Sequence, residues 1–356
     1  MKQSKITNFQ YLIMAFFLLN SFISLIGYHT LTIINQTTAL ISIIIGYFLI
    51  TIFIFLKKKI FSYKTNLTIL EKIEVLFPKS KIIIFIGLII IILAFLLYSL
   101  NNLVTFINYY ILKDVSLIVI SFTLLLTILY ALTKSMDSIF RLAEICFYIY
   151  IFIFIISTIG SMKYVNLYNI KPLLATSINN TIISSLIYFI SSIIPIFLIG
   201  MIPLNRVTSK KKTNNTLMNA SKLSSLLIFI NLFLIITSLG IELTNIYQNP
   251  DIILYKKIAF LNILERMETT LAFNNILNSF FIILMGIYFL KEVIIRLFRI
   301  KKEKETLSLS LIILILILIS TILTVPTNLY LISSLICFIL VLIIDIKFFI
   351  GKYNQN

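Results

Sequence analysis

Residues 186–204 read LIYFISSIIPIFLIGMIPL, an apolar run with Ser191 and Ser192 at its centre and Pro195 three residues further on. A helix needs about 20 residues to cross the roughly 30 Å of hydrocarbon in a bilayer. Proline removes one backbone donor and clashes with the preceding turn, while serine hydroxyls can bond the backbone groups that are freed. The run therefore predicts a membrane-spanning helix that is interrupted near its middle.

Apolar runs of this length recur along the whole chain. The protein has 356 residues, of which 60% are hydrophobic and 12% charged, and its mean hydropathy is +1.07. A soluble domain of this size needs far more polar surface, and runs that are apolar on every side, such as residues 82–97, indicate helices and not barrel strands. We predict one all-α polytopic membrane domain over residues 1–356, with ten transmembrane helices at 9–27, 33–56, 82–111, 115–133, 141–161, 182–204, 223–247, 271–298, 306–325 and 327–350.

The basic residues predict how this domain is oriented. With both termini in the cytoplasm, the predicted cytoplasmic segments hold 24 of the 30 Lys and Arg residues, and the predicted external segments hold 6. Cytoplasmic loops of membrane proteins carry such an excess. The net charge of +17 is then a topology signal facing anionic lipid headgroups. No folded basic surface remains for nucleic acid, so no nucleic-acid partner is expected.

The scarce cysteine and histidine residues argue against metal and cofactor chemistry. Cys146 and Cys337 fall inside predicted spans, and the single histidine, His29, is expected in a short external turn after the first span. Neither a disulfide framework nor a CxxC or His-rich metal site can be built from them. The external loops hold no acidic or histidine cluster for acid/base catalysis. We expect no metal, no cofactor and no enzymatic activity.

The spans are expected to form two related halves. Five helices per half make the second half enter the membrane from the opposite side, so residues 9–161 and 182–350 are predicted to be inverted repeats, as in many secondary transporters. The third and eighth spans, which correspond in such a repeat, are the two longest. Asn20 and Ser21 lie near the middle of the first span, as the serine pair does in the sixth. We predict that both helices are discontinuous.

Paired helix breaks predict a ligand site at the centre of the membrane. Unwinding aims half-helix N-termini at an anionic group such as a substrate carboxylate. On the third span, Tyr98, Asn102 and Thr105 recur at helical spacing and share a face. The alternative for all these polar residues is helix-to-helix packing and interhelical hydrogen bonding, and the sequence leaves both open. The predicted substrate-binding residues are Leu19, Asn20, Ser21, Phe22, Tyr98, Asn102, Ser191 and Ser192.

Other polar and charged residues are assigned structural roles. Arg141 follows Asp137 by four residues, a geometry that allows an ion pair, and with Glu144 these residues are predicted to form a gating or structural clamp. Three amides near the external end of the eighth span are expected in an outer vestibule or at the interface: Asn274, Asn275 and Asn278. Asp345 and Glu242 are expected at the interface, and Asp251, Glu265 and Glu268 in a lid helix lying against the membrane surface. Residues 67–76 predict a short amphipathic helix with Thr68 and Glu71 as its capping pair.

Three short motifs, in order along the chain, carry a resemblance to a known family. They are RLAEI at 141–145, NIKPLL at 169–174 and ILERMETT at 263–270. With the overall pattern, which covers nearly the whole chain, they resemble the spore germination permeases, the GerAB-like B subunits of germinant receptors, within the amino acid–polyamine–organocation superfamily. Relatives usually have glycine or another small residue where this chain has Asn20.

The resemblance implies a ten-helix LeuT-type fold with discontinuous first and sixth helices around a midplane site for an amino acid or similar small nutrient. It also implies action with A-type and lipoprotein C-type receptor subunits, in the bacterial cell membrane or, in a sporulating organism, the spore inner membrane. Two alternatives remain open. One is an autonomous amino-acid transporter that works by alternating access, and the other is a membrane-embedded glycan polymerase or flippase.

Overall fold

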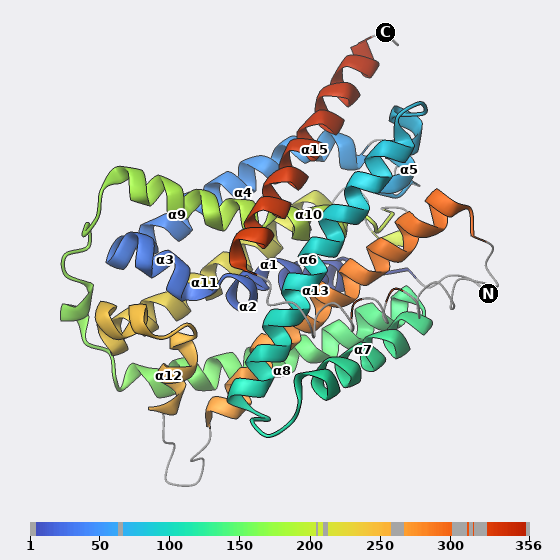
Figure 1. The fold of residues 1–356 in the computed structure, drawn as a ribbon. Helices are drawn as coiled ribbons and strands as arrows, with labels where there is room; N and C mark the ends of the chain where they lie inside the picture. The colour runs from blue at the N-terminus through green and yellow to red at the C-terminus, as the bar shows by residue number, and fades with distance from the viewer. Residues whose placement is uncertain are drawn as a thin grey trace.

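The computed structural model describes residues 5–62, 67–203, 206–208, 213–257, 267–300 and 326–353, together with Ile312 and Leu316. Apart from one isolated β-bridge, the regular structure in these ranges is helical (Figure 1). Seven ranges are long and apolar enough to cross a membrane: Asn8–Leu25, Gly27–Lys57, Lys81–Tyr110, Met136–Met162, Ile178–Ile199, Thr213–Ile246 and Thr327–Phe348. The protein is therefore a multi-pass membrane protein.

Six of the predicted spans each coincide with one helix. They correspond to α6 (Lys81–Tyr110), α7 (Leu117–Thr133), α8 (Met136–Met162), α11 (Thr213–Ile246), α13 (Met267–Phe298) and α15 (Thr327–Tyr353). α11 is kinked at Gly240, whose φ is 77°. The predicted span 306–325 lies outside the described residues except for Ile312 and Leu316. The ten-span topology therefore stays a prediction.

The first two predicted spans have different boundaries in the structure. The chain forms α1 (Asn8–Asn20), α2 (Phe22–Leu25) and α3 (Gly27–Asn35), turns through η1 (Gln36–Thr38), and continues as α4 (Ala39–Ser62). The expectation that His29 lies in the turn was wrong, because His29 is part of α3. Gly27 has φ +76°, so the chain redirects there into a further helix, and it turns only at Gln36, whose φ is 45°.

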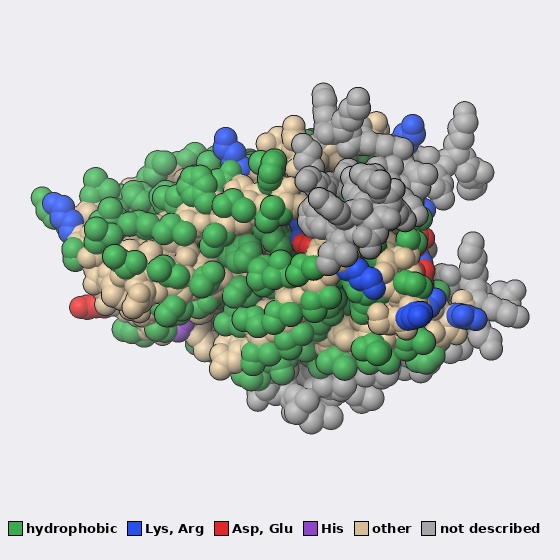
Figure 2. Space-filling view, turned by 90° about the horizontal axis from the view of Figure 1, so that it is seen from above, with side chains coloured by type: hydrophobic (Ala, Val, Ile, Leu, Met, Phe, Trp, Pro, Cys, Tyr) green, Lys and Arg blue, Asp and Glu red, His purple; other side chains and the backbone are tan. Residues whose placement is uncertain are grey.

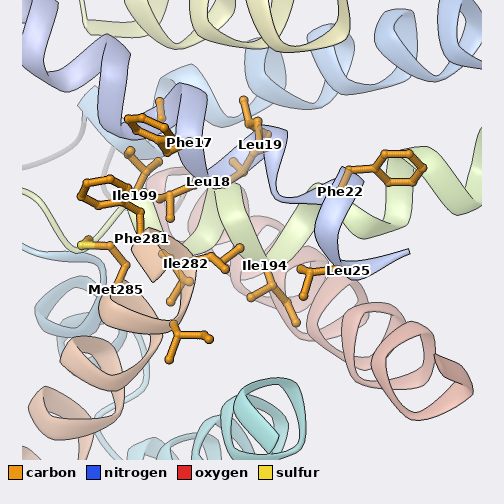
Figure 3. Close-up of a cluster of buried hydrophobic side chains, with 14 of the residues drawn as sticks. Phe17, Leu18, Leu19, Phe22, Leu25, Ile194, Ile199, Phe281, Ile282 and Met285 are labelled. Carbon is orange, nitrogen blue, oxygen red and sulfur yellow. The ribbon is translucent and has the colours of Figure 1, made fainter. Parts of the chain in front are cut away.

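The interrupted helices lie at the centre of the molecule. The sixth predicted span divides into α9 (Ile178–Ser191) and α10 (Ile193–Ile199), and α1 packs against α8, α10, α11 and α13. Figure 3 shows apolar side chains of α1 and α2 gathered with those of α10 and α13. Phe17 of α1 stacks on Phe281 of α13 with ring centroids 4.6 Å apart. Both breaks are thus held inside the apolar core.

The outer surface is suited to lipid and not to water. Large apolar side chains such as Ile83 and Phe152 are exposed, by 74% and 65%, whereas soluble monomers rarely expose large contiguous apolar patches. Figure 2 shows a face covered mainly by such residues. The visible Lys and Arg side chains gather mostly toward its right-hand end, where the N-terminus lies in Figure 1.

The short helix α5 (Ile69–Leu76) lies at this same end, and it confirms the predicted amphipathic helix. Thr68 and Glu71 form the predicted capping box at its start. Arg296 of α13 pairs with Glu71 at 3.1 Å and with Glu74 at 3.5 Å. The backbone N–H of Ile69 donates to the carbonyl of Gly200, just after α10, at 3.1 Å. α5 therefore ties α10 to α13.

The N-terminal segment is joined to the chain that follows α10. Ile6 forms a parallel β-bridge with Val207. The N–H of Ile6 donates to the Arg206 carbonyl at 2.9 Å, and the N–H of Thr208 donates to the Ile6 carbonyl at 3.0 Å. The ends of α1 and α10 nearest this bridge are consequently held to one another.

Candidate functional site

The first helix is interrupted at two places. α1 ends at Asn20, and the Ser21 hydroxyl donates to the Leu18 carbonyl at 2.6 Å before α2 begins. The second interruption follows Leu25, where Gly27 takes φ +76°, a conformation that costs a residue with a Cβ about 1–2 kcal/mol. The first position is the one that Asn20 and Ser21 predict. The second belongs to a glycine that the sequence analysis did not single out.

The sixth helix is interrupted at the predicted serine pair. α9 ends at Ser191 and α10 begins at Ile193. Pro195 has no N–H to donate to the carbonyl four residues earlier, which is that of Ser191. The hydroxyl of Tyr330 on α15 donates to this carbonyl at 2.8 Å. A side chain from another helix therefore satisfies the backbone group that proline leaves open.

The predicted face of the third span connects the two interrupted helices. Tyr98 Oη donates to the Leu25 carbonyl, and Asn102 Nδ2 donates to the Ser24 carbonyl, at the end of α2. The ring of Tyr98 stacks on that of Tyr330, with centroids 5.4 Å apart. A hydrogen-bonded and stacked path thus joins the carbonyl end of α2 to the break between α9 and α10. Thr105 bonds carbonyls of its own helix.

Asn20 is the centre of a buried polar cluster. Its Nδ2 donates to Tyr150 Oη on α8 at 2.5 Å and to Asn278 Oδ1 on α13 at 3.3 Å. Ser224 Oγ on α11 donates to its Oδ1 at 3.5 Å. The interfacial expectation for the α13 amides was wrong, since α13 turns them toward α1, α8 and α12 (Pro250–Lys256), and at most 8% of each is exposed: Asn274, Asn275 and Asn278.

A cavity of about 610 Å³ lies beside the junction of α2 and α3. Of the predicted substrate-binding residues, Tyr98 and Asn102 line it. The others are buried close to the breaks and do not line it: Leu19, Asn20, Ser21, Phe22, Ser191 and Ser192. The lining residues are Ile23, Ser24, Leu25, Ile26, Gly27, His29, Thr30, Ile33, Ile34, Tyr98, Asn101, Asn102, Gln248, Asn249 and Thr327. None of these described lining residues is Lys, Arg, Asp or Glu.

The charged residues make contacts that spacing alone did not reveal. Asp345 of α15 pairs with Lys57 of α4, and these side chains are 15% and 6% exposed. The helix that carries Asp345 packs on α10 and α4. The interfacial position of Asp345 stays a prediction. Glu144 accepts from Gln10 of α1 at 2.9 Å. The ion pair of Asp137 with Arg141 stays a prediction.

The segment predicted to lie flat on the membrane surface instead buries an acid. α12 (Pro250–Lys256) carries Asp251, which is 5% exposed and accepts from Asn275 Nδ2 at 3.0 Å. Packing against α3, α8, α11 and α13 turns this side chain inward. The Glu265 and Glu268 side chains lie outside the described residues. Among the described residues, no group of three His, Cys, Asp or Glu side chains is placed to hold a metal ion.

Comparison with curated proteins finds no match to this chain. A family model described as spore germination protein, the spore permease family, matches residues 5–329. The match covers nearly the whole chain, including the three motifs, and confirms the resemblance that they carry. The chain belongs to the spore germination protein family.

Proposed function

We propose that this permease-like membrane protein binds an amino acid in the cavity beside the α2–α3 junction and acts as the B subunit of a germinant receptor. The observation that carries the proposal is the meeting of two helix ends at one polar cavity. The carbonyl end of α2, at Ser24 and Leu25, and the amide end of α3, at Gly27, both contribute to the lining.

These two helix ends offer complementary partial charges to a zwitterion. A helix C-terminus presents carbonyl oxygens that favour a cation, and a helix N-terminus presents N–H groups that favour an anion. The ammonium and carboxylate of one amino acid can therefore be stabilised side by side. Each carbonyl oxygen has two lone pairs. The Leu25 carbonyl accepts from both Tyr98 and Asn102, whereas the Ser24 carbonyl accepts from Asn102 and retains acceptor capacity for a ligand.

The composition of the lining favours a ligand without net charge. Amides and hydroxyls dominate its polar groups. A ligand with a net charge would lose its hydration on binding, and no described lining side chain carries the opposite charge to compensate. The cavity volume lies within the range of about 300–1,000 Å³ typical of small-molecule sites. A neutral polar nutrient similar in size to an amino acid fits the same lining.

Sensing follows if the ligand binds one arrangement of the interrupted helices better than another. The path from the α2 carbonyls through Tyr98 and Tyr330 to Ser191 connects both interruptions. A ligand at the α2 end shifts the population of conformations by its differential affinity. In this proposal the change is read by A-type and C-type subunits in the spore inner membrane, and the ten spans form a LeuT-like inverted repeat with both termini in the cytoplasm.

A thermal-shift screen of the full-length protein in nanodiscs tests the binding site. We expect one or a few of the twenty amino acids to raise the melting temperature. A ligand at a concentration of 100 times its dissociation constant stabilises the folded protein by about 2.7 kcal/mol. Asn102→Leu should abolish this shift. The matched control is Thr105→Val, one turn away on the same face but outside the lining, which should retain it. A shift that survives Asn102→Leu, or no shift with a monodisperse sample, contradicts the proposal.

Uptake into proteoliposomes separates the receptor subunit from the autonomous transporter. Binding without uptake of the same amino acid supports the sensing role. Concentrative or exchange uptake supports the transporter alternative, to which the interrupted helices are equally suited.

A further inference from the structure

Asp251 is a carboxylic acid buried in a part of the chain that does not cross the membrane. The helix that carries it, α12, lies outside the seven ranges suited to span a bilayer. Asn275 Nδ2 of α13 donates to its carboxyl group, and backbone N–H groups at the start of α12 supply further bonds. In the described part of the chain, no basic side chain forms an ion pair with it.

Among the residues that the structure describes, the side chains placed around Asp251 are phenols and amides. Tyr28 of α3, Tyr150 of α8 and Tyr255 of α12 lie near its carboxyl, and Asn275 of α13 donates to it. Asn231 of α11 accepts from Tyr255, and Asn274 of α13 donates to the Tyr150 carbonyl. The nearby charged residues Glu242, Lys256 and Lys257 are exposed. His29 Nε2 lies 3.0 Å from the Asn245 carbonyl. An ionised Asp251 therefore has no countercharge among these residues.

Burial raises the pKa of the Asp251 carboxyl. The hydrogen bonds from Asn275 and the backbone lower it, but by less than burial raises it. The buried arrangement therefore favours the neutral acid. Exposure to water returns the group to an ordinary pKa of about 3.9. The sign follows from linkage: the buried arrangement is most stable at low pH, and it loses stability as pH rises toward the raised pKa.

Buried polar atoms near Asp251 are left without hydrogen-bond partners. They are Tyr28 Oη, Asn274 Oδ1 and Asn278 Nδ2. Such groups in membrane protein interiors are usually completed by water. They extend from the surroundings of Asp251 to Asn278, whose amide oxygen meets Asn20 at the first helix break. The buried polar interior around Asp251 therefore continues as far as the first helix break.

The segment before α12 forms part of the cavity wall. Gln248 and Asn249 line the cavity, and Asn249 Nδ2 donates to Tyr110 Oη of α6 at 3.4 Å. The Gln248 carbonyl lies 3.7 Å from the position that a Cβ on Gly27 would take. Movement of α12 therefore changes the wall of the cavity beside the α2–α3 junction.

We propose that Asp251 is a proton-binding site, at which the neutral acid holds α12 against α3, α8, α11 and α13 and loss of the proton to water releases it. This inference needs no ligand in the cavity and goes beyond the proposed receptor role. It assigns to α12 an opening equilibrium that depends on pH, with the carboxyl of one residue as the controlling group.

Thiol labelling of the full-length protein in nanodiscs tests this site without any ligand. In a background where Cys146 and Cys337 are replaced by alanine, Leu254→Cys on α12 places a thiol at a site that is 1% exposed. Tyr247→Cys places one at a site that is 39% exposed and serves as the control. Dividing the first maleimide labelling rate by the second removes the effect of pH on thiol reactivity.

With Asp251 present, the rate ratio should rise at least about fivefold between pH 4 and 8 and level off once the pH passes the raised pKa, since a single site can contribute up to tenfold per pH unit. With Asp251→Asn the ratio should not change with pH. The same rise in both proteins, or no rise in either, overturns the proposal. A rate ratio that changes when sodium replaces choline in the buffer at fixed pH also overturns it, because the carboxyl would then bind a metal ion.

Asn275→Leu keeps the test decisive if Asp251→Asn fails to fold. This variant retains the acid but removes a donor that favours its ionised form, so the midpoint of the rise should move to higher pH. An unmoved midpoint contradicts the proposal. Because no amino acid is added, the outcome is independent of the ligand screen, and either proposal can fail alone.

Discussion

At the scale of single residues, the interrupted helices depend on side chains from other helices. Pro195 leaves the Ser191 carbonyl without its helical donor, and Tyr330 supplies one. Asn20 similarly bonds Tyr150 and Asn278, which lie on α8 and α13. Polar residues at helix centres in this protein therefore work as matched partners, and removing one leaves another buried and unpaired.

Tyr330→Phe should destabilise the protein because the Ser191 carbonyl remains buried without a donor. The expected loss is about 1–3 kcal/mol, measured by unfolding in mixed micelles. Tyr109→Phe is the control, since Tyr109 is 68% exposed, and it should be nearly neutral. Adding Pro195→Ala restores a backbone donor, so the cost of Tyr330→Phe should fall in that background. An equal cost in both backgrounds contradicts the role assigned to the hydroxyl.

At the scale of elements, the junction of α2 and α3 decides where the cavity lies. Gly27 begins α3 with a positive φ, so the carbonyl end of one helix and the amide end of the next lie at the same cavity. α6 then seals the α2 end through Tyr98 and Asn102. The cavity is thus built around a backbone conformation and bounded by residues of the third predicted span.

Gly27→Ala should destabilise the protein by about 1–2 kcal/mol, because an alanine at φ +76° is strained. The nearest atom to the added Cβ is 3.7 Å away, so steric overlap is not the cause. Gly87→Ala in α6 is the matched control, with its nearest atom at 3.9 Å, and helix propensity predicts a gain of about 0.5–1 kcal/mol. Mixed-micelle unfolding measures both. If both substitutions changed the free energy of unfolding in the same direction, strain at Gly27 would not explain the result.

At the scale of the whole molecule, the two ends of the helical bundle differ in character. α12 and the cavity wall that precedes it lie toward the left of Figure 1, while α5 and the N-terminus lie toward the right. The right-hand end is closed by the bonds of α5 to α10 and α13 and by the β-bridge at Ile6. The positive-inside pattern predicts that this end faces the cytoplasm.

Labelling of single cysteines in whole cells tests this orientation. In the cysteine-free background, Tyr168→Cys should react with a membrane-impermeant maleimide in intact cells, and Val75→Cys only after permeabilisation. The two sites are 77% and 47% exposed and lie at opposite ends. Reversed labelling would invert the topology, and labelling of both in intact cells would place η2 (Leu167–Ile170) and α5 on one side, contrary to the prediction.

The sequence by itself determined the class of protein, most helix positions and the interruptions of the first and sixth predicted helices. These depend on local properties: run length against bilayer thickness, the missing N–H of Pro195, and the capping pair Thr68–Glu71. Tertiary structure decided which polar side chains meet. Asp251 and Asn275 lie 24 residues apart in the chain, Lys57 and Asp345 lie 288 apart, and Tyr330 and Ser191 lie 139 apart. Their pairing depends on how helices rotate and pack, which hydropathy and spacing do not encode.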